Sequence, residues 1–126
     1  MTRKYSSISV ETTLASGISN SATTMTVAAG TGSALMGGVT LAAGNVDIFT
    51  VALDVDTQNE EIVFITAQSV DSFTITRGQA GTTAVAHASG AAVKHVLTSS
   101  DLNYFNQAIQ STTPPGSTPT IDGGTP

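Results

Sequence analysis

The first group of residues that could carry chemistry is an acidic loop in the middle of the chain. Asp54, Asp56, Asn59, Glu60 and Glu61 offer the oxygen atoms that calcium prefers as ligands. A calcium loop also needs a glycine at its sixth position and a glutamate at its twelfth, and neither residue stands there. We therefore favour a polar turn whose Asp and Asn side chains bond to the backbone, and we expect no metal.

The two histidines, His87 and His95, form the second candidate group. A zinc site needs at least three protein ligands, and no third ligand lies in register with this pair. His87 stands among alanines and glycines, where an imidazole can bond to loop carbonyls and fix the shape of the loop. A structural role is therefore favoured over metal ligation or pH sensing.

The third group is the segment from Arg77 to Gly81, whose glycines suggest a phosphate-binding loop. It lacks the Gly-Lys-Ser/Thr ending and the following helix that such a loop needs. Gly78 and Gly81 are expected to supply positive φ angles, and Arg77 to pair with Glu60 or Glu61 across a hairpin. No Gly-x-Ser-x-Gly nucleophile motif occurs either, so we expect no catalytic residue, no cofactor and no enzyme.

Composition indicates one small domain with few charges. The chain has 126 residues, of which 10% are charged, against about 25% in ordinary globular proteins. Either Ser and Thr supply the polar surface, or neighbours in an assembly cover it. The formal net charge of -5 opposes binding to nucleic acid, and Arg3 and Lys4 either dock on an acidic partner or solubilise the terminus.

No cysteine is present, so neither disulfides nor thiolate metal sites are expected. Polar residues interrupt the N-terminal segment, which therefore does not read as a signal peptide. No apolar run approaches the roughly 18 to 20 residues that cross a bilayer. We expect no membrane partner.

Alternating apolar residues predict a β-rich core. Phe49 to Val55 is expected to be the clearest amphipathic strand, with Phe49, Val51, Leu53 and Val55 on one face. With the two strands that follow it, this segment forms an antiparallel meander. The fold class is therefore all-β, a small antiparallel β-sandwich or barrel. The other expected strands span residues 8–14, 24–28, 60–67, 73–76 and 91–96, and residues 29–44 are expected to form a loop.

One helix is expected, from about Ser100 to Gln110, with Ser99 or Ser100 as its cap. Its apolar face carries Leu102, Phe105 and Ile109, which would pack on the sheet edge or on a neighbouring subunit. Beyond it, a tail rich in Pro, Gly and Thr forms an extended arm. The predicted division is an N-terminal arm and first strand in 1–22, a β-rich core module in 23–98, the helix in 99–110 and the arm in 111–126.

The loop that begins Thr76-Arg77-Gly78 and continues through Gly81-Thr82, His87 and Gly90 resembles a known module. It is similar to a β-rich module of tailed-bacteriophage structural proteins, in which a "TRG…GT…A…H…G" loop precedes a closing strand. The N-terminal part, Tyr5 to Val27, resembles the start of the same small virion proteins. The resemblance covers roughly residues 3 to 110. It implies a structural loop carried by Arg77, Gly78, Gly81, His87 and Gly90.

What the resemblance implies is a non-enzymatic virion structural protein. Our own choice within that class is a capsid decoration, or cement, protein on the head surface, which would bind the major capsid protein and form a homotrimer at threefold points of the shell. The alternative is a minor tail or tail-tip protein that contacts other tail proteins. The expected partner contacts are Arg3, Lys4, Tyr5, Leu102, Phe105, Ile109, Pro114 and Pro115.

A carbohydrate-binding module on the virion surface is the second alternative. Sugar sites usually use exposed aromatic faces, yet aromatic residues make up only 5% of the chain and no Trp is present. Tyr5 and Tyr104 are the residues that could serve such a site.

Overall fold

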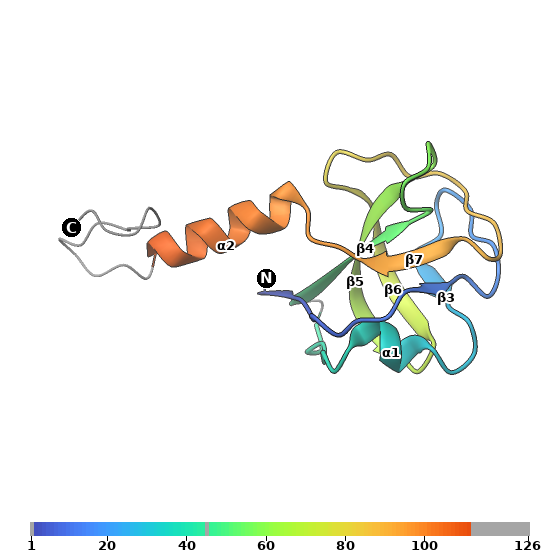
Figure 1. Ribbon diagram of the computed structural model, residues 1–126, viewed down its shortest axis with the longest axis horizontal. Helices are drawn as coiled ribbons and strands as arrows, with labels where there is room; N and C mark the ends of the chain where they lie inside the picture. The colour runs from blue at the N-terminus through green and yellow to red at the C-terminus, as the bar shows by residue number, and fades with distance from the viewer. Residues whose placement is uncertain (1, 45, 112–126) are drawn as a thin grey trace. The chain divides into compact units, whose positions relative to one another are not determined.

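The computed structural model describes residues 2–44 and 46–111, and its contacts divide the chain into two units, Met1–Val96 and Leu97–Pro126. The first unit is built mainly from strands and the second contains a helix (Figure 1). The elements of the first unit are β1 (Thr2–Lys4), β2 (Thr12–Thr13), β3 (Thr24–Thr26), α1 (Gly32–Met36), β4 (Asp47–Leu53), β5 (Glu61–Ser69), β6 (Ser72–Gln79) and β7 (Ala92–His95). The second unit contains α2 (Ser99–Ser111).

The strands form one sheet with the order β2-β7-β4-β5-β6-β3. Its centre is the antiparallel meander β4-β5-β6, which confirms the sequence prediction. β5 occupies one edge of β4, and two strands share the other edge. There β1 runs parallel to β4, with Lys4 opposite Phe49, and β7 runs antiparallel, with His95 opposite Val51.

The sheet curls until its two outer strands meet (Figure 1). Leu14, just after β2, forms a bridge with Val27, just after β3. Two backbone hydrogen bonds of 2.9 Å flank the bridge, from Ala15 N–H to Thr26 O and from Ala28 N–H to Thr13 O. The predicted small antiparallel all-β fold is therefore confirmed.

The core lies inside the curled sheet, and alternate residues of β4 contribute to it. Phe49, Val51 and Leu53 belong to the core cluster and are fully buried. The prediction that β4 is amphipathic is wrong, because Thr50 and Ala52 are buried as well, with exposed fractions of 2% and 0%. The alternating residue types correctly predicted which side chains of β4 face the core. They could not predict that Thr50 and Ala52, on the opposite face, are buried as well.

The first predicted strand, over residues 8–14, is also wrong for most of its length. Only Thr12 and Thr13 form β2, whereas Ile8 and Val10 are exposed at 71% and 56%. The expected loop at 29–44 contains the short helix α1, so the expectation of a single helix is wrong too. α1 exists because Leu35 and Met36 are buried in the core, where packing stabilises a helix too short to form alone.

The second unit contains the predicted helix, with bounds Ser99–Ser111. Its cap is Thr98, not Ser99 or Ser100. The Thr98 Oγ1 atom accepts from Asp101 N–H at 3.2 Å, and the Asp101 carboxylate accepts from Thr98 N–H at 3.0 Å, as in a capping box. No helix within the described residues has the length and apolar character needed to span a bilayer.

Candidate functional site

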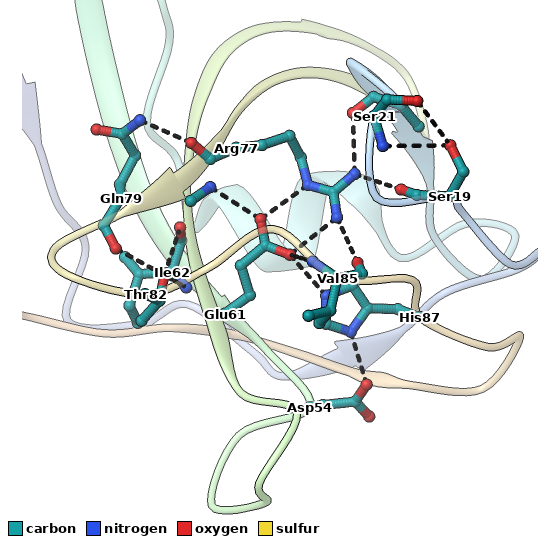
Figure 2. Close-up of polar contacts among 12 residues, drawn as sticks. Ser19, Ser21, Asp54, Glu61, Ile62, Arg77, Gln79, Thr82, Val85 and His87 are labelled. Carbon is teal, nitrogen blue, oxygen red and sulfur yellow. Dashed lines mark hydrogen bonds and ion pairs between the residues drawn. The ribbon is translucent and has the colours of Figure 1, made fainter.

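A buried polar cluster joins the ends of four segments of the first unit (Figure 2). Asp54 directly follows β4, Glu61 begins β5, Arg77 lies near the end of β6, and His87 lies in the loop between β6 and β7. The meander places the first three close together, because the end of β4, the start of β5 and the end of β6 lie at the same end of the sheet. Two of these residues, Arg77 and His87, belong to the loop predicted from sequence.

Glu61 is the centre of this cluster, and its side chain is 0% exposed. Arg77 donates to its two carboxylate oxygens from Nε and Nη2, both at 2.8 Å. The backbone N–H groups of Gly78 and Val85 donate to it at 2.9 and 3.1 Å. His87 Nε2 lies 2.9 Å from Oε1. The carboxylate therefore makes five polar contacts, with four residues, and has no contact with solvent.

Arg77 uses every N–H group of its guanidinium inside the protein. Beside the two bonds to Glu61, Nη2 donates to the carbonyl of Val85, and Nη1 donates to the carbonyls of Ser19 and Ala22 (Figure 2). A guanidinium has five N–H donors, so none is left for a ligand. The sequence predicted Arg77 to pair with Glu60 or Glu61, and the structure shows the pair with Glu61.

His87 bridges two carboxylates, and its side chain is 0% exposed. Its Nδ1 lies 2.7 Å from Oδ2 of Asp54, and its Nε2 faces Glu61. The expectation that the imidazole bonds to loop carbonyls is therefore wrong. Its backbone instead pairs with Ile18 in both directions, at 2.9 and 3.0 Å, which fastens this loop to the segment after β2.

The hydrogen bonds keep Glu61 ionised despite its burial. Burial alone would raise its pKa, but the bonds from Arg77, His87, Gly78 and Val85 outweigh that effect and lower the pKa from 4.5 to about 2. The cluster is therefore charged, and its geometry has to compensate for the lost hydration of each ion.

Gly78 and Gly81 have the positive φ angles that the sequence predicted, 61° and 82°. The left-handed turn at Gly78 follows Arg77 directly, and the N–H of the same glycine donates to Glu61. Thr82 was missed by sequence reasoning. Its hydroxyl accepts from Ile62 N–H at 2.9 Å and donates to Gln79 O at 2.7 Å, which closes the loop against β5.

The acidic loop after β4 is a turn, as favoured from sequence. Thr57 donates to the carbonyl of Asp54 from its N–H at 3.2 Å and from its hydroxyl at 2.7 Å. The Asp54 carboxylate, however, bonds to His87 rather than to its own turn. Among the described residues, no group of three or more histidine or acidic side chains is placed to hold a metal ion.

None of the residues predicted to contact partners is among the hydrogen-bond partners described above for the polar cluster. Arg3 and Lys4 lie on β1, where the Arg3 guanidinium stands 4.9 Å from the centre of the Phe64 ring. In the second unit, Leu102 is 57% exposed, and Phe105 makes an edge contact with Tyr104. The side chain of Ile109, and all of Pro114 and Pro115, lie outside the described residues.

In residues 5–10, between β1 and β2, the apolar side chains face solvent and two of the serines are partly buried. Tyr5, Ile8 and Val10 are 57%, 71% and 56% exposed, whereas Ser6 and Ser9 are partly buried. The two serine hydroxyls donate to backbone carbonyls at the end of α1, and the backbone of Val10 does the same at 2.9 Å. The carbonyls that accept these bonds belong to Ala34, Leu35 and Gly37. We call this stretch the apolar segment.

The polar cluster is suited to fastening loops rather than to chemistry. Its arginine has no N–H group left to bind a substrate, and its glutamate and histidine are fully enclosed. The apolar segment is the contrasting feature, because it exposes apolar contact area at Tyr5, Ile8 and Val10. No protein-family model matches this chain, and a search of the curated proteins gives no match either.

Proposed function

We propose that this protein is a non-enzymatic structural component of a tailed-phage virion, bound to the outside of the head as a decoration protein. The assignment to a phage virion rests on the resemblance of the loop from Arg77 to Gly90 to the phage module. The observation that carries an assembly role is the apolar segment. The choice of the head over the tail is ours, as is the major capsid protein as partner.

The apolar segment supports a binding role because it is held outward. Turning Ile8 or Val10 inward would break the bonds that Ser6 and Ser9 make to the end of α1. Contiguous exposed apolar side chains on a soluble protein commonly mark an interaction surface. Burying an aliphatic side chain of this size contributes roughly 1.5 to 3 kcal/mol. Ile8 and Val10 are two such side chains, and together they supply a useful part of a docking free energy.

The polar cluster supports the same role by making one end of the sheet rigid. Arg77 and His87 together fasten the segments near residues 18–22 and 80–90 to the meander. A rigid body loses less entropy on binding than a mobile one, so more of the contact energy appears as affinity. If the protein binds across a joint between capsid subunits, opening the shell must also break the contacts between the protein and those subunits.

The test is the protein composition of separated heads and tails from intact particles. We expect copies close in number to the major capsid subunits, found on heads. A few copies found only on tails would refute the head placement and favour the minor tail alternative. Absence from both fractions would refute a virion role.

A binding assay with purified heads tests the surface itself. The double substitution Ile8→Ser and Val10→Ser should weaken binding at least ten-fold, since the two replacements together remove apolar area worth more than about 1.4 kcal/mol. The matched control is Val70→Ser, which changes a 76% exposed valine outside the apolar segment, in the turn between β5 and β6. Equal binding by all three proteins would show that the apolar segment is not the contact.

A further inference from the structure

We propose that His87 is an imidazolium, protonated on both ring nitrogens, and that it works as a proton-dependent clasp between the β6–β7 loop and the turn after β4. The inference rests on the geometry of the buried polar cluster. It is independent of the virion role and can fail or hold without it.

The two ring nitrogens face acceptors only. Nδ1 lies 2.7 Å from a carboxylate oxygen of Asp54, and Nε2 lies 2.9 Å from one of Glu61. A neutral imidazole has one N–H and one lone pair, whereas an ionised carboxylate has no proton to donate. With a single proton, one of the two contacts would set a lone pair against a negative oxygen. Two protons on the ring satisfy both contacts at once.

A proton on Asp54 would be the other way to satisfy the Nδ1 contact. The Asp54 side chain is 24% exposed, so water stabilises its negative charge. Protonated Glu61 does not account for the Nε2 contact either, because four hydrogen bonds from Arg77, Gly78 and Val85 hold its carboxylate in the ionised form. The proton therefore belongs on the buried ring between them.

Charge balance supports the same assignment. The groups that face His87 are Asp54 from the end of β4 and Glu61 from β5, and Arg77 from β6 faces Glu61 in turn. Ile18, from the segment after β2, contributes only its backbone. An imidazolium makes this group of four neutral. A neutral ring would leave the group with one net negative charge and would set a buried ring lone pair against a carboxylate oxygen, which is costly.

The clasp opens on one side first. When His87 loses one proton, the remaining proton stays toward Glu61, which is 0% exposed and cannot turn to water. Asp54 can turn to water, so the bond from His87 to the turn after β4 is the one that breaks. Residues 54–60 then lose their tie to the β6–β7 loop, while the loop stays attached to β5.

His95 supplies an internal comparison. Its Nδ1 lies 2.7 Å from the carbonyl of Thr50, to which it donates, and its Nε2 accepts from Ser6 N–H at 3.2 Å. These contacts require one proton, on Nδ1, and a lone pair on Nε2. The two histidines of the chain are therefore expected to be in different protonation states under the same conditions.

The experiment is nitrogen NMR of the full chain with labelled histidine, near neutral pH. We expect both ring nitrogens of His87 to resonate as protonated nitrogens, and His95 to show one protonated and one unprotonated nitrogen. An unprotonated nitrogen signal from His87 would overturn the proposal. This measurement needs no substitution, so a failure to fold cannot obscure it.

Two variants then test the clasp. Asp54→Asn removes one facing charge, and the second proton of His87 should be bound at least ten-fold more weakly, roughly the effect of one neighbouring carboxylate. Asp56→Asn is the control in the same turn, because Asp56 is exposed and does not contact the ring. Equal proton affinity in the two variants would contradict the role of Asp54. Backbone amide exchange in residues 54–60 should also accelerate only in Asp54→Asn.

Discussion

Glu61→Gln is the substitution that separates a charged cluster from a merely polar one. Glutamine keeps the shape of the side chain but removes the negative charge that faces Arg77 and His87. Its amide nitrogen also replaces an acceptor by a donor where only donors surround it. The variant therefore loses ionic attraction and creates a donor that opposes another donor.

The magnitude follows from the pKa of the carboxyl. Glu61 has a pKa of about 2 in the folded chain against 4.5 in an exposed side chain. At roughly 1.4 kcal/mol for each pKa unit, this difference is worth about 3 kcal/mol of stability at neutral pH. Removing one partner from a buried ion pair typically costs about 3 to 5 kcal/mol, which is the same range. We expect the free energy of unfolding to fall by that amount.

The sign of the pH dependence is fixed by the same numbers. Because the folded pKa lies below the unfolded value, the stabilisation is complete above pH 4.5 and is lost as pH falls toward 2. The natural chain should therefore lose stability steeply between these values. The Gln variant should show a much flatter acid limb, because it has no carboxyl to protonate at this site.

The assay is urea unfolding at neutral pH and at several acid pH values. An unchanged dependence of the unfolding free energy on urea concentration would show that both proteins expose the same surface on unfolding. The matched control is Glu60→Gln, the same change one residue earlier, at a partly exposed side chain. It should change stability by no more than about 0.5 kcal/mol. A Glu61→Gln protein within about 1 kcal/mol of the natural chain, with the same acid limb, would refute this reasoning.

Three further substitutions test other parts of the fold. Val70 has φ of 57° in the β5–β6 turn, and since a branched residue is strained there, Val70→Asn should raise stability by about 1 kcal/mol, seen as a higher Tm. An added Cβ at Gly32 would lie 2.1 Å from the carbonyl oxygen of Val70, so Gly32→Ala should lower the free energy of unfolding by about 2 kcal/mol, whereas Ser33→Ala beside it should not. Thr98→Ala removes the cap of α2 and should cost that helix about 1 kcal/mol, measured as faster amide exchange in its first turn and unchanged exchange in the sheet.

The meander and the ion pair of the site could be predicted because their signals are local. Ile62, Phe64, Phe73 and Ile75 alternate over short distances, and a hairpin between those segments places Arg77 within reach of the start of β5. Cross-strand pairing supplies a physical rule for such contacts. No comparable local rule connects His87 to Asp54, which are 33 residues apart and are brought near each other by the pairing of β7 with β4.

The N-terminal third shows why the rest could not be predicted. Ile8, Val10, Thr12 and Leu14 alternate as a strand would, yet only the last two are buried. Their fate depends on serine bonds to α1, a helix that itself depends on core packing rather than on helix propensity. The alternation of apolar residues is present in the sequence, but contacts with residues distant in the sequence determine which of them are buried.

Because β1 and β7 pair along the same edge of β4, these strands must pair in a fixed order while the chain is synthesised. The apolar segment is held at one end by β1 on β4 and at the other by β2 on β7, which begins only at Ala92. While the chain emerges, Thr12 must wait for Val93, about eighty residues later, and such distant pairings form slowly. The segment that carries Ile8 and Val10 is therefore held at both ends only once β2 has paired with β7. In the docking role proposed above, an unfinished chain would not yet hold this surface in place, so binding would follow the completion of folding.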